Sequence, residues 1–156
     1  MQTVQRVVNI VTLTGCKSLA VDVGGPGGGV VDRLRELGHD VEAVHFGGGA
    51  TDPQRFRNWR AEAFWMLREA MERGEVSLPD DDDLRSDLSS LRYMFTQDGR
   101  IQIESKDDCR KRLGRSPDRA DAVALAHWRA STTERGSWLC YLGGQVVDLY
   151  EGRVVR

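Results

Sequence analysis

The sequence predicts an α/β domain in which short strands alternate with amphipathic helices. Three observations favour this class. A strand, a glycine-rich turn, a helix and a second strand follow one another over residues 18–46, the longest helical pattern covers 52–76, and residues 100–105 alternate strictly as a strand. With 156 residues, of which 40% are hydrophobic and 29% charged, the chain is long enough for one domain with a substantial core.

The first third of the chain is predicted to contain a βαβ unit. Residues 6–13 ("RVVNIVTL") and 18–23 ("SLAVDV") are β-branched apolar runs that favour strands. Residues 30–38 ("VVDRLRELG") have helical spacing with a glycine at their end, and residues 40–46 ("DVEAVHF") alternate as a strand. A strand, helix and strand in this order normally form a parallel pair with a right-handed crossover.

The glycine run at residues 24–29 does not predict a nucleotide site. A G-x-G-x-x-G motif starting at Gly25 would need glycine or alanine at position 30, where valine stands, and "TGCKS" lacks the P-loop spacing. We therefore expect no nucleotide cofactor. The glycines are expected to let a helix begin close to the end of a strand.

The remaining elements are predicted from periodicity and turn signals. Residues 52–76 should form a long helix with Asp52 as its cap and Pro53 in its first turn. Residues 83–95 predict a helix that runs into a strand, which "QDG" turns back into the strand at 100–105. "SPDRADAVALA" opens another helix, with Ser116 as N-cap and Pro117 first, and residues 131–156 are predicted to be a variable tail or hairpin.

Composition limits the setting of the chain. No apolar run approaches the length of a membrane span, and the N-terminal residues lack the order of a signal peptide, so we expect a cytoplasmic protein with no membrane partner. Cys16, Cys109 and Cys140 are scattered, which suits structural thiols in a reducing compartment. The net charge of −2 does not mark the whole molecule as a polyanion binder.

Two carboxylates three residues apart on the helix at 116–126 are candidate functional groups. Asp118 complements the helix macrodipole, whereas Asp121 lies in a run of small apolar residues, where a charge needs a partner or a metal. Asp22 lies near the carboxyl end of a predicted strand, where parallel sheets face their binding crevice. If these three acids meet, they would select Mg²⁺ or Mn²⁺, and two such ions can support phosphodiester hydrolysis.

A basic stretch precedes these acids. The segment "DDCRKRLGRSPDR" brings several cationic side chains up to the helix that carries Asp118 and Asp121. Cations beside paired acids can hold a phosphodiester next to a bound metal ion. The alternative is a solvated charged face.

Three blocks of the sequence together resemble a known family. Residues 19–48, 58–95 and 99–126 are similar, in this order, to the C-terminal nuclease domain of the phage terminase large subunit, and the resemblance covers about residues 18–130. It implies a ribonuclease H-like mixed sheet flanked by helices, and a Mg²⁺- or Mn²⁺-dependent endonuclease that cuts double-stranded DNA with two ions during packaging. By position, the implied catalytic and metal-binding residues are Asp22, Asp118 and Asp121. The implied DNA-binding residues are Lys106, Arg110, Lys111, Arg112 and Arg115.

The resemblance also has a gap. The family's first acid lies upstream of the position of Asp22, but residues 1–21 contain no Asp or Glu. We therefore expect a domain over residues 1–130 with an atypical or truncated start at 1–17, so that its first strands are incomplete. We also expect its metal site to hold one ion in place of two. The alternative function is a catalytically impaired prophage remnant that binds DNA or a packaging partner, such as the portal or the small terminase subunit. A junction resolvase of the same fold is a third hypothesis.

Overall fold

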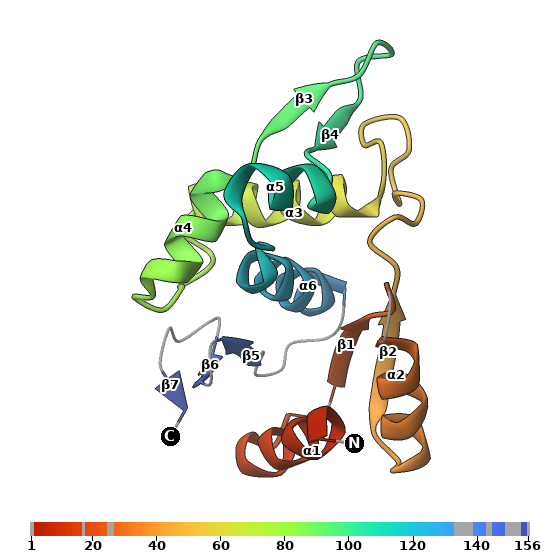
Figure 1. Ribbon diagram of the computed structural model, residues 1–156, viewed down its shortest axis with the longest axis vertical. Coiled ribbons are helices and arrows are strands. Elements are labelled where there is room, and N and C mark those ends of the chain that lie inside the picture. Colours follow the sequence, from red (N-terminus) through yellow and green to blue (C-terminus); the bar gives the residue numbers. More distant parts are fainter. Residues whose placement is uncertain are drawn as a thin grey trace.

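The computed structural model describes residues 2–16, 18–24, 27–132, 139–142, 145–148 and 154–155 (Figure 1). Helices and strands are interspersed along the chain, which confirms the predicted mixed α/β class. The helices are α1 (Gln2–Thr14), α2 (Gly27–Glu36), α3 (Trp59–Glu72), α4 (Asp82–Ser90), α5 (Lys106–Leu113) and α6 (Asp118–Thr132). The strands are β1 (Ser18–Asp22), β2 (Asp40–Val44), β3 (Tyr93–Phe95), β4 (Ile101–Ile103), β5 (Leu139–Leu142), β6 (Gln145–Asp148) and β7 (Val154–Val155).

The predicted βαβ unit is confirmed, and the element before it differs. β1 and β2 pair in parallel, from Ser18 opposite Asp40 to Asp22 opposite Val44, with α2 between them in sequence. The strand predicted at residues 6–13 is wrong, because this segment belongs to α1. Val4 of α1 is buried against α2 and β2, and the valines at positions 7 and 8 repeat its helical spacing. The spacing of these residues, and not their β-branched type, decides the element.

The long helix α3 begins later than predicted. Asn58 is its N-cap, and its side-chain oxygen accepts the N–H of Ala61 at 2.9 Å. Asp52, predicted as the cap, accepts the N–H groups of Gln54 and Arg55, each at 3.1 Å, and so closes a turn in the preceding loop. The predicted start at residue 52 is therefore wrong. The late start places Arg60 in the first turn of the helix.

A helix, a hairpin and an unpredicted helix connect α3 to α6. Asp81 caps α4 by accepting the Leu84 N–H at 2.8 Å. β3 and β4 pair antiparallel, as the alternation and the "QDG" turn predicted. α5, which the sequence reading missed, is capped by Ser105 and ends at Gly114 with φ 74°. These caps fix where the basic residues of α5 lie relative to α6.

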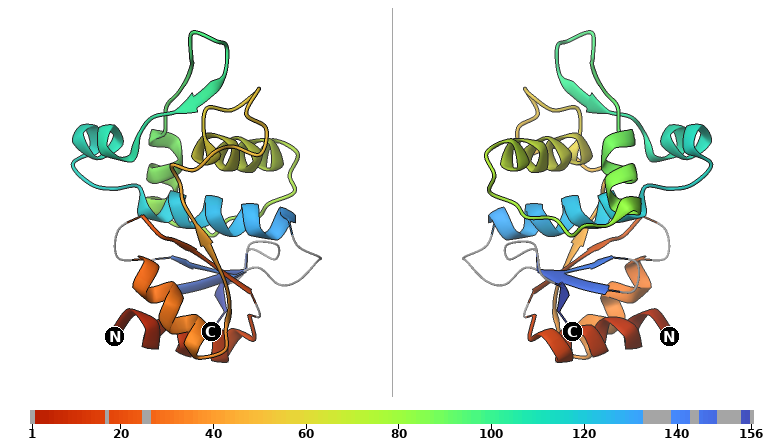
Figure 2. Two further views of the ribbon diagram at one scale, coloured as in Figure 1. Left: turned by 90° about the vertical axis from the view of Figure 1, so that its right-hand side faces the viewer. Right: turned by 90° about the vertical axis from the view of Figure 1, so that its left-hand side faces the viewer.

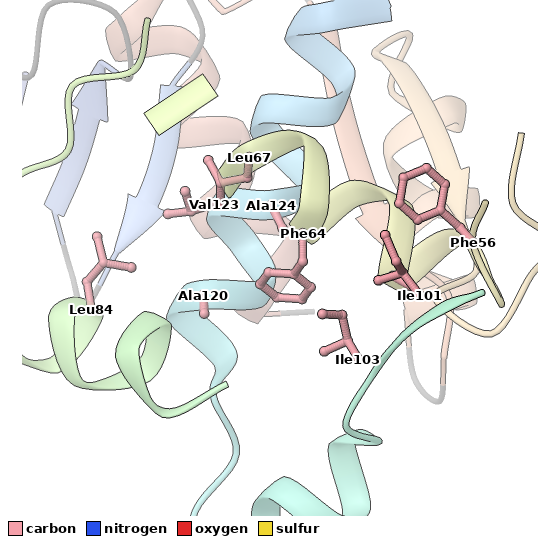
Figure 3. Packing of buried hydrophobic residues seen from close by; sticks show 10 residues of the cluster. Phe56, Phe64, Leu67, Leu84, Ile101, Ile103, Ala120, Val123 and Ala124 are labelled. Carbon is pink, nitrogen blue, oxygen red and sulfur yellow. The ribbon is translucent and has the colours of Figure 1, made fainter. Parts of the chain in front are cut away.

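Helix α6 crosses the middle of the molecule, between α3 and α4 on one side and β1 and β2 on the other (Figure 2). Its small residues pack into the main core, where side chains from α3, α4, α6 and β4 meet (Figure 3). This core contains Phe56, Ala61, Phe64, Leu67, Leu84, Ile101, Ile103, Ala120, Val123 and Ala124. The close packing of α6 fixes the position of the acids in its first turn.

The strands form separate small sheets among the described residues. β1–β2 and β3–β4 are two-stranded, and β5–β6–β7 is a three-stranded antiparallel sheet in the segment expected as a tail or hairpin. The single mixed sheet of the sequence prediction is therefore not found in this part of the chain. No helix within the described ranges is long and apolar enough to cross a bilayer.

A half-buried histidine on α6 predicts a dependence of stability on pH. His127 is partly buried, its Nδ1 has no hydrogen-bond partner in the described part of the chain, and burial lowers the pKa of its imidazole. Because the folded state binds the proton less well than the unfolded state, stability should fall as the pH drops below about 6.5. We expect urea unfolding at pH 7.5 and pH 5 to show this loss, and His127→Gln to reduce it. An equal loss in both proteins would contradict this explanation.

Candidate functional site

The carboxylate of Asp121 lies buried at the point where α3, α5 and α6 meet. Its side chain is 8% exposed, and each of its oxygens faces a different cation. Oδ1 is 3.1 Å from Nη2 of Arg60, and Oδ2 is 3.0 Å from Nζ of Lys106. The burial predicted for this residue is thus observed, and its partners are basic side chains from two other helices.

Lys106 joins the two acids of α6. Its Nζ is 3.0 Å from Oδ1 of Asp118, at the same distance as from Asp121. Asp118 is 73% exposed, so this pair extends from the buried carboxylate to the surface. Lys106 is the first residue of α5, directly after the Ser105 cap, and the start of α5 therefore faces the start of α6. Two carboxylates share one cation in this arrangement.

Burial and charge act in opposite directions on these groups. Burial raises the pKa of Asp121 above its ordinary value, although the charges of Arg60 and Lys106 act to lower it. Burial alone would lower the pKa of Lys106, but the carboxylates of Asp121 and Asp118 outweigh it, so this pKa is raised. The lysine therefore keeps its proton, and the carboxylate depends on cations for its charged form.

Arg60 holds Asp121 through charge. The guanidinium is 6% exposed and lies 4.9 Å from the ring centre of Phe64 and 5.9 Å from that of Phe46. Beyond the ion pairs, neither its nitrogens nor the oxygens of Asp121 have a hydrogen-bond partner among the described residues. Buried carboxylate oxygens with unused lone pairs are hard ligands suited to a divalent cation such as Mg²⁺ or Mn²⁺.

Sequence reasoning missed Arg60, although a signal was present. Arg60 lies four residues before Phe64 and seven before Leu67, which places it on the apolar face of α3. A cation on a buried face implies a buried anion elsewhere in the chain. Asp121 is that anion.

Asp22 is at the carboxyl end of β1, as predicted, but its carboxylate turns back on its own chain. Its Oδ1 accepts the N–H of Gly24 at 2.9 Å. Within the described ranges, no group of three or more His, Cys, Asp or Glu side chains is arranged to hold a metal ion. The expected meeting of Asp22 with Asp118 and Asp121 is therefore not found there, because Asp22 closes the turn after β1.

The predicted DNA-binding residues of the basic stretch are all exposed, but they differ in the ion pairs that they form. Arg112 forms an ion pair with Glu104 at 2.5 Å and donates to the carbonyl of Ser90 at 2.7 Å. Arg115 forms an ion pair with Asp87 of α4. Arg110 and Lys111 are exposed on α5, with Lys111 3.8 Å from Asp108. Arg112 and Arg115 are thus bound to carboxylates of this chain, although both are exposed.

Comparisons with solved structures identify the architecture. No protein-family model and no curated protein matches the sequence. The nuclease domain of the large terminase subunit gp2 of bacterial virus Sf6 superposes with a TM-score of 0.61 at 21% identity, covering 78% of this chain and 69% of that one. The chain has the fold of a terminase nuclease domain.

Two further structures of that Sf6 domain match this terminase-nuclease fold. A lysine-to-alanine mutant solved with manganese gives a TM-score of 0.61 at 20% identity, covering 78% of this chain and 70% of that one. A lysine-to-alanine mutant solved with calcium gives the same TM-score and identity over 78% and 69% of the two chains. The Sf6 domain thus accommodates divalent ions in these structures, and the predicted resemblance is confirmed at the level of fold.

Proposed function

We propose that this terminase-nuclease domain is a divalent-metal-dependent endonuclease that cuts double-stranded DNA in phage DNA packaging. The observation that carries the proposal is the buried Asp121, whose Oδ2 shares the Lys106 ammonium with Oδ1 of Asp118. Such a pair can exchange one cation for another without leaving a buried charge unpaired. We also propose that the fold of this domain is ribonuclease H-like.

The proposed metal ligands are Asp118 and Asp121, whereas the carboxylate of Asp22 closes its own turn at the end of β1. A bound Mg²⁺ or Mn²⁺ would lower the pKa of a water molecule and neutralise charge on the phosphate. In the chain itself, the charge of Arg60 favours the ionised form of Asp121, and Lys106 carries the positive charge at the acid pair. With two carboxylates brought together, the site fits one ion better than two.

Plasmid nicking tests this function. We expect the chain with Mn²⁺ to nick supercoiled plasmid, and Asp121→Ala or EDTA to reduce nicking to background, because the ion loses its buried ligand. Asp82→Ala is the matched control, since the Asp82 carboxylate is 94% exposed and pairs with Arg85 in its own helix. Nicking by Asp121→Ala at the wild-type rate would overturn the proposal.

Arg110 and Lys111 are the proposed DNA-contacting residues. Arg112 and Arg115 are exposed as well, but they are engaged in ion pairs with the carboxylates of Glu104 and Asp87. Replacing both with alanine should weaken DNA binding and reduce the slope of log K against log salt by about 0.9 for each phosphate that the variant no longer neutralises. Fluorescence anisotropy at several salt concentrations measures this slope. Replacing Arg6 and Arg33, which are exposed on α1 and α2 away from α5, removes the same charge and should leave the slope unchanged (Figure 1).

A binding module without nuclease activity is the second candidate. The hydrogen bond between the Asp22 carboxylate and the Gly24 N–H favours this second candidate. A site with two carboxylates binds a metal ion more weakly than a site with three. Its partner would be DNA or a packaging protein such as the portal or small terminase subunit. Salt-dependent DNA binding without nicking in Mn²⁺ would support this candidate over the endonuclease.

A further inference from the structure

Asp87 on α4 is a buried acid that the proposed nuclease site does not use. Its side chain is 1% exposed, although it lies on a helix whose other acids are at the surface. A charge buried to this degree must be matched by charge or by hydrogen bonds. The partners of the Asp87 carboxylate lie at the start of α6.

The two oxygens of Asp87 bind the chain on either side of Asp118. Oδ1 forms an ion pair with Nη1 of Arg115, just before the start of α6. Oδ2 accepts the backbone N–H of Arg119, in the first turn of α6, at 3.2 Å. First-turn N–H groups have no partner within their own helix, and a negative charge there is favourable. Asp87 therefore caps α6 from a different helix.

The side chain of Arg119 strengthens this attachment. It forms an ion pair with Asp81 and a second one with Asp83 at 2.8 Å. Arg115 also donates to the Ser86 hydroxyl at 3.2 Å. The two arginines that flank Asp118 in sequence are thus bound to α4, while Asp118 itself remains at the surface beside Lys106.

We propose that Asp87 is a positioning residue that sets the first turn of α6, so that Asp118 and Asp121 share one cation. Its effect on catalysis rests on the proposed nuclease function, whereas its effect on the helix does not. Arg115 then belongs to this attachment and not to the DNA-binding surface.

The test compares Asp87→Ala and Asp87→Asn with Asp82→Asn. Asparagine keeps an acceptor of the same shape and loses the charge, so it separates the charge from the hydrogen bond. Asp82→Asn removes a carboxylate that is 94% exposed and pairs with Arg85 of its own helix, outside the attachment to α6. Titration calorimetry should show Mn²⁺ affinity about 10–100-fold weaker in Asp87→Ala, less weakened in Asp87→Asn and unchanged in Asp82→Asn.

Hydrogen exchange gives a readout that needs no metal. The Arg119 amide should lose protection in Asp87→Ala by about ten-fold more than the Ala124 amide, deeper in α6, because only the first turn loses its acceptor. Equal changes at both amides, with Mn²⁺ affinity unchanged, would show that Asp87 is merely a stabilising residue and would overturn the inference. If the wild-type chain binds no Mn²⁺, the nuclease proposal fails and the exchange ratio still decides the role of Asp87.

Discussion

Arg60→Met should lower the free energy of unfolding by about 3–5 kcal/mol, because it leaves the buried carboxylate of Asp121 without its internal cation. Arg60 and Asp121 are each almost fully buried and lie 3.1 Å apart. Methionine has a similar length and no charge, so the loss measures the unpaired charge more than a change in volume. Chemical denaturation at neutral pH gives the free energy directly.

Arg68→Met is the matched control for this loss. Arg68 lies on the same helix, pairs with Glu72 at 2.8 Å and stacks 4.6 Å from the Trp65 ring centre, but its side chain is 47% exposed. An exposed pair contributes less than about 1 kcal/mol, so this variant should remain close to wild type. Equal effects of the two substitutions would contradict the assigned role of the buried pair.

A double variant separates charge from packing. Arg60→Met with Asp121→Leu replaces the buried pair by apolar side chains, and such replacements are often neutral or stabilising. We expect this variant to recover most of the stability that Arg60→Met removes while failing to bind Mn²⁺. If the double variant is as stable as the wild type but binds no Mn²⁺, then Asp121 is needed for function and not for folding.

The features that depend on short stretches of sequence could be predicted. The parallel pair of β1 and β2, the β3–β4 hairpin and the helix that carries Asp118 and Asp121 follow from spacing and turn residues within a few positions. Asp121 could be identified as buried because apolar neighbours surround it in sequence. The same local rules wrongly predicted a strand for part of α1, because they gave more weight to its β-branched residues than to their helical spacing.

The partners of the charged side chains could not be predicted, because they are far apart in sequence. Arg60 comes from α3 and Lys106 from α5, and nothing local to Asp121 indicates either. In the same way, Arg115 reads as part of a basic surface until Asp87 is found beside it. Asp22 was placed at the right end of β1, but the direction of its carboxylate depends on the Gly24 turn.

Gly27→Ala should destabilise the domain by about 3 kcal/mol, at the upper end of the cost of adding an atom to a packed site. A Cβ at Gly27 would lie 1.9 Å from the carbonyl oxygen of Asp22 and 2.9 Å from its carbonyl carbon. Both atoms belong to the backbone of β1, so no side chain can move aside. α2 must shift away from β1, and the turn that holds Asp22 must shift with it.

Gly28→Ala should have the opposite effect, because no atom of the described residues lies within 4 Å of a Cβ at that position. Alanine there reduces the freedom of the unfolded chain and should stabilise the domain by about 0.4–1 kcal/mol. Thermal unfolding of the two variants side by side tests whether α2 starts in contact with the end of β1. If Gly27→Ala is as stable as Gly28→Ala, that close approach does not exist, and the position of Asp22 is set by the Gly24 turn alone.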